Sequence, residues 1–368
     1  MRTLASYNEM STPLPFLVYS AWGTVFGFDL PDLRVLSLVI AFITFISFYF
    51  LANLRFHRQD ISWLLTLFLV FHPYMIGFSL FVFTDMLTIL LIILTCIGIL
   101  RENFLVLLIS MAFGLLSRQY YAFVTIAAGL YYLIRYMKSR QSRELFFMIG
   151  VGLSCLPLLG LFLLWHGASP SNTLQDVYLQ GQFEFHPSAL TLYTLQLFVY
   201  FSPLVILRWK SIYKPFSLIM ALPLSAWYWF FPVHAAASAG AQNIDTVGFF
   251  HRFIRMFGQG WIENILLYLT YFLAIPVLIY MIANLFRDLK ETNPHFNLFS
   301  SIAILTFLVI MPFSYLVWEK YFMLLVPIGA FPFFPTGESF QLFERSKIKI
   351  RVIARDLSKR FDTSMHIK

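Results

Sequence analysis

Charged residues are scarce in this sequence. Only 12% of its 368 residues are Asp, Glu, Lys or Arg, whereas a soluble domain contains about 25%. Mean hydropathy is +0.75, and apolar runs close to the length that crosses a bilayer, about 20 residues, recur along the chain. These properties exclude a soluble multidomain protein. They predict an all-α fold, namely a polytopic bundle of transmembrane helices joined by short loops.

Cysteine and the common short catalytic motifs are scarce as well. The two cysteines, Cys96 and Cys155, lie within apolar runs, which gives neither a disulfide framework nor a metal-ligand spacing. The sequence has no glycine-rich phosphate loop, nucleophile elbow or paired-cysteine motif. A nucleotide-binding enzyme is therefore disfavoured, and we expect no cofactor and no metal. Residues 1–12 also lack the apolar core of a cleavable signal peptide.

Eleven apolar runs are predicted to be transmembrane helices. They cover residues 35–54, 61–80, 86–100, 104–117, 120–135, 145–165, 190–207, 215–232, 262–286, 298–317 and 321–336. Several are short, which is typical of broken helices that line a cavity inside a bundle. The predicted parts of the chain are an N-terminal segment (1–34), the bundle with longer loops (35–336, with loops 166–189 and 233–261) and a basic tail (337–368).

The distribution of Lys and Arg predicts the orientation of the bundle. Twenty of the 26 basic residues lie in one alternating set of loops and in the tail, and the other set holds Arg2, Arg34, Arg118, Arg252, Arg255 and Lys320. By the positive-inside rule the first set is cytoplasmic. The net charge of +8 therefore indicates membrane orientation and not nucleic-acid binding. On the outer face, the aromatic segment 13–28 is predicted to be an amphipathic helix at the membrane interface.

Two polar positions on the predicted outer face interrupt apolar runs. Asp85 lies between two such runs, where a carboxylate is costly unless it faces a cavity or a partner. The alternative is a helix N-cap. Arg118 and Gln119 interrupt the stretch 104–134 on the same face. Arginine can bind a phosphate with two hydrogen bonds, and the alternative is a tight turn with an arginine that snorkels to the interface.

Two further clusters on this face combine basic and aromatic residues. Lys320 and Tyr321 lie between two predicted spans, so Lys320 could contact a lipid phosphate. The alternative is an aromatic-belt turn with a surface ion pair. At helical spacing, His251, Arg252 and Arg255 share one face, which suits a helix that contacts lipid headgroups. A direct role in binding a substrate is the other interpretation.

Several short motifs resemble those of a known family. These are Ser11-Thr12-Pro13 before the interfacial segment, Asp32-Leu33-Arg34 at the start of a span, Phe83-Thr84-Asp85, Gly114 through Arg118-Gln119, Glu184-Phe185-His186-Pro187, and Lys320-Tyr321 through Pro327. In this order they resemble the GT-C family of membrane glycosyltransferases. Within it, the chain is most similar to the α-1,2-glucosyltransferases that use dolichyl-phosphate glucose.

The resemblance implies a reaction and its participants. A sugar would pass from a polyprenyl- or dolichyl-phosphate donor to a glycan, lipid or protein acceptor at the outer or lumenal face. Asp85 and Glu9 would be the catalytic carboxylates, and the basic and aromatic residues named above would bind substrate. In the family a first span leads into a lumenal loop that carries the acidic base. Here Glu9 is the only acidic residue before the Thr-Pro segment, so we expect either a missing N-terminal span or a rearranged site.

A transporter or lipid-linked-sugar flippase is the alternative from another class. Such a protein should carry ionisable residues near the middle of its spans, often in repeated halves. The span centres are nearly free of charge here, with His72 as a weak exception, and no internal repeat is visible. The enzyme interpretation is therefore favoured. Its membrane would be the bacterial plasma membrane or that of the endoplasmic reticulum.

Overall fold

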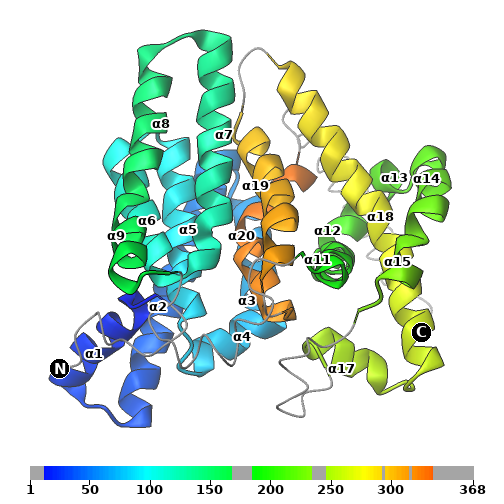
Figure 1. Ribbon diagram of the computed structural model, residues 1–368, viewed down its shortest axis with the longest axis horizontal. Helices are drawn as coiled ribbons and strands as arrows, with labels where there is room; N and C mark the ends of the chain where they lie inside the picture. Colours follow the sequence, from blue (N-terminus) through cyan, green and yellow to red (C-terminus); the bar gives the residue numbers. More distant parts are fainter. Residues whose placement is uncertain (1–11, 168–184, 234–245, 292–294, 315–316, 335–368) are drawn as a thin grey trace, which may run out of the picture.

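The computed structural model describes residues 12–167, 185–233, 246–291, 295–314 and 317–334. Every regular element in these ranges is a helix (Figure 1), which confirms the predicted all-α class for the described residues. Glu9, the basic tail and most of the two longer loops lie outside these ranges.

The first half of the described chain forms a compact group of antiparallel helices, with α5 packed between α2 and α6. Its elements are α1 (Leu14–Phe26), α2 (Leu30–Phe56), α3 (Gln59–Val70), α4 (Pro73–Leu80), α5 (Asp85–Leu100), α6 (Phe104–Ser117), the 3-10 turn η2 (Gln119–Tyr121), α7 (Ala122–Ser139), α8 (Ser142–Ser154) and α9 (Leu156–Trp165).

The second half is built around α18, the longest helix described, which packs against α11, α14 and α19. Its elements are α11 (Pro187–Tyr200), α12 (Ser202–Leu207), α13 (Trp209–Ile212), α14 (Pro215–Ser225), α15 (Trp227–Phe230), α17 (Phe249–Arg255), α18 (Trp261–Lys290), α19 (Phe296–Ile310), η3 (Met311–Phe313), η4 (Glu319–Leu324), α20 (Val326–Gly329) and η5 (Phe331–Phe333).

Within the described residues, four helical segments are long and apolar enough to cross a membrane. They are Leu30–Phe56, Ser142–Trp165, Trp261–Lys290 and Phe296–Phe313, and a fifth span results if the bent pair α3–α4 is counted as one. The other predicted spans are also helical where they are described, but they are shorter or broken. The membrane class of the protein is thus supported, and the count of eleven spans stays a prediction.

The predicted span 61–80 is broken in the structure. Its two helices, α3 and α4, meet at an angle of 68°. The break falls at Phe71 and His72, and Pro73 begins α4. Proline disfavours a helical conformation in the residue before it and lacks an N–H to donate, which accounts for the position of the break. The bend turns α4 across the end of the bundle, toward α17 (Figure 1).

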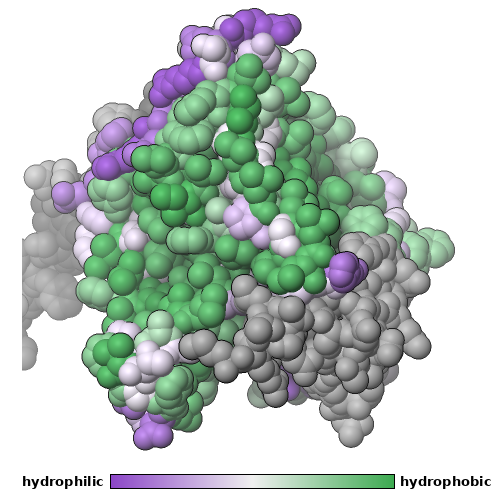
Figure 2. All heavy atoms as spheres, turned by 60° about the vertical axis from the view of Figure 1, so that its left-hand side comes forward, coloured by the Kyte–Doolittle hydropathy of each residue, from purple (hydrophilic) through white to green (hydrophobic). Residues whose placement is uncertain are grey.

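The described loops that carry most of the basic residues meet at one end of the bundle, called the basic end here. Arg55 donates to Asn297 at 2.9 Å, and Lys138 donates to the carbonyl oxygen of Leu289 at 2.6 Å. In Figure 2 hydrophilic residues gather at the top of the molecule, where α7 and α8 meet, above a broad apolar flank. This arrangement agrees with the predicted alternation of loops, whereas the identity of the cytoplasmic side stays a prediction.

The opposite end carries α1, α4 and α17 (Figure 1) and is called the site end. The segment η4–α20–η5 runs from it to the basic end through the interior, because Glu319 contacts α17 while Phe334 accepts from Asn297. We expected one regular span over 321–336. The structure instead has short, buried helical turns, and side chains satisfy carbonyl groups at its end: Arg208 donates to Phe333 at 2.7 Å and Asn284 to Pro332 at 3.1 Å. Such partners are what irregular backbone needs within a membrane.

Candidate functional site

Asp85 and Arg118 form an ion pair at the site end. Arg118 Nη2 lies 3.2 Å from each carboxylate oxygen of Asp85 and also donates to Thr84 Oγ1. The Asp85 side chain is 4% exposed and that of Arg118 16%. The sequence placed both residues at one face, and the structure brings them into contact. Because the pair is largely removed from water, each charge depends on the other.

The alternative interpretation of Asp85 as an N-cap is wrong. Asp85 is the first residue of α5, the cap position is occupied by Thr84, and no side chain caps this helix end. The Asp85 carboxylate is instead directed at Arg118. A negative charge in the first turn still interacts favourably with the helix dipole.

The turn that carries Arg118 is held in place by buried hydroxyl groups. Ser117 and Thr88 share a hydrogen bond of 2.7 Å between α6 and α5. Tyr121, just beyond Arg118, is bonded to Thr95, and its ring lies where a side chain at Gly114 would be. Helices commonly pack closely in membranes through small residues and through hydrogen bonds between hydroxyl groups of neighbouring helices. They fix the position from which Arg118 reaches Asp85.

Lys320 lies close enough to this pair to be affected by both charges. Burial lowers the pKa of Lys320, while the negative charge of Asp85 raises it and the positive charge of Arg118 lowers it. Its Nζ lies 4.6 Å from the centre of the Trp318 ring and 5.5 Å from that of Tyr321, which are cation–π distances. Asp85 therefore pairs with Arg118 and also interacts electrostatically with Lys320, and two cations against one carboxylate leave a local charge that favours an anion.

Gln119 and Tyr321, the other predicted residues of this group, lie beside it. Gln119 begins η2 directly after Arg118 and is half-buried. Tyr321 is buried, and its ring lies 4.6 Å from that of Tyr120. The ring contact joins the η2 turn to η4, and hence Arg118 to Lys320. Binding of substrate by either residue stays a prediction.

A cavity of about 340 Å³ opens beside Lys320. It is called the outer cavity here, and its lining residues are Tyr74, Thr246, Val247, Gly248, Phe249, Arg252, Trp318 and Lys320. Arg252 of α17 and Lys320 of η4 give this cavity two positive charges from segments far apart in the sequence. The Arg252 guanidinium is oriented by a hydrogen bond of 3.2 Å from its Nε to Thr246.

An apolar pocket of about 430 Å³ adjoins the outer cavity, since both are lined by Phe249. The pocket lies along the broken span and is lined by Phe68, Phe71, His72, Pro73, Val199, Tyr200, Ser202, Pro203, Phe249, Phe250 and Phe253. A cationic cavity next to an apolar one suits a molecule with a charged head and a hydrocarbon tail.

Glu319 is fully buried and accepts four hydrogen bonds. Its carboxylate accepts hydrogen bonds from the Tyr200 hydroxyl at 2.6 Å and the Tyr74 hydroxyl at 3.2 Å. It also accepts from the backbone N–H groups of Phe250 and His251, both at 2.9 Å. Its exposed fraction is 0%. The alternative interpretation of this turn, a surface ion pair, is therefore wrong as far as Glu319 is concerned, because its side chain is buried and finds its hydrogen-bond partners within the protein.

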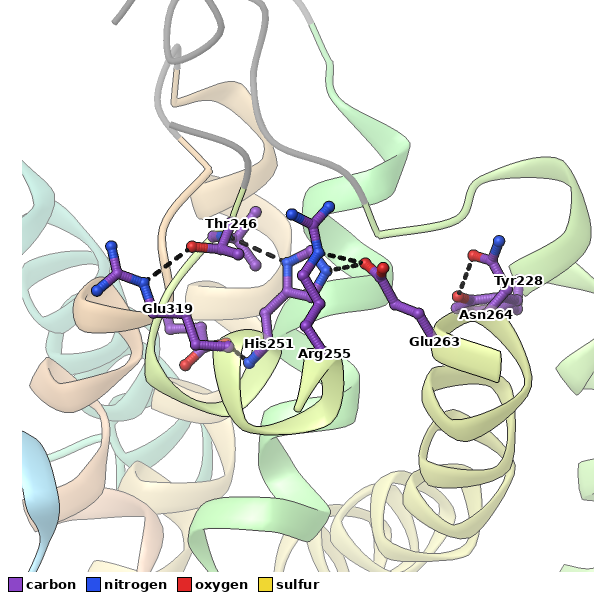
Figure 3. A network of polar contacts seen from close by, with 9 residues as sticks. Tyr228, Thr246, His251, Arg255, Glu263, Asn264 and Glu319 are labelled. Carbon is purple, nitrogen blue, oxygen red and sulfur yellow. Dashed lines mark hydrogen bonds and ion pairs between the residues drawn. The ribbon is translucent and has the colours of Figure 1, made fainter. Parts of the chain in front are cut away.

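His251 and Arg255 of α17 both contact Glu263, the third residue of α18. His251 Nε2 lies within hydrogen-bond distance of Glu263 Oε1, and Arg255 Nε donates to the same oxygen at 3.0 Å. Figure 3 shows the two side chains pointing from α17 toward Glu263. The Val247 N–H donates to His251 Nδ1 at 3.2 Å, so the ring proton lies on Nε2. His251 is 1% exposed, which places it in this network and leaves Arg252 as the residue of the three that lines the outer cavity.

The sequence predicted neither Glu319 nor Glu263 as a residue of the site. Asp85 is singled out as a carboxylate between apolar runs at the outer boundary. The same criterion applies to Glu319, so the sequence is sufficient to predict Glu319 as a site residue. Glu263 gives no such signal, because its partners His251 and Arg255 lie in another helix across a loop. Among the described residues, no group of three or more His, Cys, Asp or Glu could hold a metal ion.

The lowered pKa of Lys320 predicts how anion binding should depend on pH. Lys320 is positively charged below its pKa, so affinity for a phosphate should fall as the pH rises through that value, which lies below the ordinary 10.5 of a lysine. A titration of farnesyl phosphate binding between about pH 7 and pH 10 measures this, because phosphate is already doubly charged above about pH 7. With Lys320→Arg the fall should disappear, since arginine stays protonated throughout. An identical fall in Lys320→Arg would contradict the assignment.

No protein-family profile matches this chain, and no curated protein or solved structure is similar to it.

Proposed function

We propose that the protein is a membrane glycosyltransferase that moves a sugar from a polyprenyl- or dolichyl-phosphate carrier to a glycan, lipid or protein acceptor at its site end. The observation that supports this most strongly is the buried ion pair of Asp85 with Arg118, whose charges both act on the nearby Lys320. The adjoining cationic and apolar cavities are the second support. The proposed partners are thus the lipid-phosphate sugar, its acceptor and the membrane lipids.

The reaction assigns a separate task to each charge. The bond between the sugar C1 and the phosphate oxygen breaks, and the phosphate leaves on its lipid with an additional negative charge. Arg118 and Lys320 would stabilise that charge. The acceptor oxygen forms the new bond to C1 and gives up its proton, for which Asp85 would be the base. Arg118 Nε is buried and has no hydrogen-bond partner among the described residues, so it can donate a hydrogen bond to one more oxygen.

A binding experiment tests the anionic part of this proposal. Farnesyl phosphate and farnesol share one apolar chain and differ in the phosphate, so their ratio of affinities reports recognition of the phosphate alone. Arg118→Gln and Lys320→Gln should each weaken binding of farnesyl phosphate about tenfold or more, because a hydrogen bond to a charged group contributes ~1.5–3 kcal/mol. Farnesol binding should not change.

Arg58→Gln is the matched control for these variants. Arg58 also pairs with an aspartate, Asp60, at 2.6 Å, but it follows α2 at the basic end. The Arg58→Gln variant should therefore bind farnesyl phosphate as tightly as the unchanged protein does. If both Arg118→Gln and Lys320→Gln kept full phosphate binding, these residues would have no place in the site.

One observation favours the second candidate, a transporter or lipid-linked-sugar flippase. The 68° break between α3 and α4 is a feature of transporter helices that line a substrate path, and the buried His72 lies at the break. In proteoliposomes a flippase would move the intact lipid-linked sugar across the bilayer, whereas a glycosyltransferase would cut the sugar from its carrier. Analysis of the lipid product separates the two.

A further inference from the structure

We infer that Glu319 is a positioning residue that sets the spacing of the two cavity cations, Arg252 and Lys320, and so makes the site selective for a phosphate head over an uncharged one. The inference rests on the proposed function, since it concerns the same anion. Glu319 itself is fully buried and is not among the residues that line the outer cavity.

The two cations reach the outer cavity from different segments. Lys320 follows Glu319 directly in η4, and Arg252 lies in α17, two residues after Phe250. Nothing in the sequence fixes the distance between these segments. Glu319 does so in the structure, because its carboxylate accepts from the N–H groups of Phe250 and His251 in the first turn of α17. Glu319 therefore binds α17, the helix that carries Arg252, and is itself the neighbour of Lys320 in the chain.

The connection between η4 and α17 extends beyond the Glu319 side chain. The Glu319 N–H donates to the carbonyl oxygen of Val247 at 2.9 Å, just before α17. Tyr74 of α4 donates to Glu319 and accepts from the Phe249 N–H at 2.9 Å. Tyr200 of α11 completes the group at 2.6 Å. Three helices, α4, α11 and α17, thus converge on one carboxylate, whose partner Tyr74 lines the outer cavity and whose partner Tyr200 lines the apolar pocket.

The type of group at this position matters as much as its presence. The carboxylate accepts one bond at Oε1 and three at Oε2, an arrangement that suits a group with two acceptor oxygens and no donor of its own. A glutamine of the same size would place an N–H₂ group against at least one backbone N–H. Two donors facing each other in a buried site are costly, so α17 would move away and take Arg252 with it.

Glu263 holds α17 independently of Glu319, through the side chain of His251 in the first turn and that of Arg255, the last residue of the helix. Loss of the Glu319 bonds should therefore tilt α17 and leave it attached to the bundle. Three of the eleven residues that line the apolar pocket lie in α17, and the other eight lie in the broken span α3–α4 and in α11 and α12, none of which is held by Glu319 alone. We accordingly expect recognition of the phosphate to fail while binding of the hydrocarbon chain persists.

The test compares the unchanged protein with Glu319→Gln, both as full chains in nanodiscs, using farnesyl phosphate and farnesol as probes. The unchanged protein should bind the phosphate much more tightly than the alcohol. Glu319→Gln should lose about tenfold or more of this preference and keep its farnesol affinity. A residue with a merely structural role would weaken both probes together.

Hydrogen exchange provides a second measurement that does not depend on ligand. The Phe250 and His251 amides should be protected in the unchanged protein, and both should exchange at least tenfold faster in Glu319→Gln. Glu319→Asp keeps the charge but is one methylene shorter, so it should give smaller changes in both measurements. This variant keeps the inference testable if Glu319→Gln does not fold.

The outcomes distinguish the inference from the proposed function. Unchanged phosphate preference or unchanged amide protection in the Glu319 variants would overturn the inference alone, and so would equal loss of both probes in a folded variant. If the unchanged protein bound farnesyl phosphate no better than farnesol, the proposed function would fail, and the inference would fail with it.

Discussion

Asp85→Asn should lower the rate of sugar transfer by about 10²-fold or more, the usual effect of removing an acid–base group. Asparagine has nearly the same shape as aspartate and can still accept a hydrogen bond from Arg118, 3.2 Å away. It cannot take the proton of the acceptor hydroxyl. The loss should therefore appear in the rate of transfer at saturating donor, measured with radiolabelled lipid-phosphate sugar, and much less in donor binding.

The structure offers a matched control in Asp60→Asn. Asp60 is also an acidic residue in the first turn of a helix and also pairs with an arginine, Arg58, at 2.6 Å. Its pair lies at the basic end, away from the proposed site. Asp85→Asn should lose more stability than Asp60→Asn, because the Asp85 side chain is buried in its ion pair whereas that of Asp60 is about one-third exposed. Transfer should continue normally in Asp60→Asn. Normal transfer by Asp85→Asn at normal thermal stability would remove Asp85 from the catalytic group.

Gly248→Ala should abolish phosphate selectivity and destabilise the protein. A Cβ atom at this position would lie 2.6 Å from both Cβ and Cδ of Glu319 and would also overlap the Tyr74 hydroxyl. Contacts this short force one partner to move, and overpacking of this kind costs ~1–3 kcal/mol. The movement would separate α17 from Glu319. We expect at least a tenfold fall in farnesyl phosphate affinity, measured together with the melting temperature.

Gly77→Ala is the control for this change. Gly77 lies in α4, near the same end of the bundle, and a Cβ atom there would have nothing within 4 Å. Alanine is also the better helix former, so stability and binding should be unchanged or slightly improved. If Gly248→Ala bound farnesyl phosphate as tightly as Gly77→Ala does, close contact between α17 and Glu319 would not be required.

The sequence predicts the helices better than their shapes. Apolar runs define α5 and α6 to within a residue of the predicted 86–100 and 104–117, since burial in lipid or protein requires them. The break at His72 and the irregular path of η4–α20–η5 depend on prolines whose effect is decided by neighbours. Pro73 interrupts a span, whereas Pro276 lies within the continuous helix α18.

The candidate site likewise has residues that the sequence predicts and contacts that it does not predict. Charge placed at an apolar boundary was enough to single out Asp85, Arg118 and Lys320, because such charges need partners. The same rule could have found Glu319 but was not applied to it. The network of His251, Arg255 and Glu263 depends on how α17 folds back on α18. The spacing of residues within one helix predicts which of them share a face, but it does not identify the segment against which that face packs.

The most direct test of the central claim is sugar transfer by the purified protein in liposomes. The measurement supplies polyprenyl- and dolichyl-phosphate sugars with a labelled sugar, together with a mixture of glycan, lipid and peptide acceptors, and follows the label. We predict that label leaves the lipid carrier for an acceptor, that unglycosylated lipid phosphate accumulates in equal amount, and that Asp85→Asn does neither. Movement of intact lipid-linked sugar across the bilayer without its cleavage, by a folded protein, would contradict the enzyme and support a flippase.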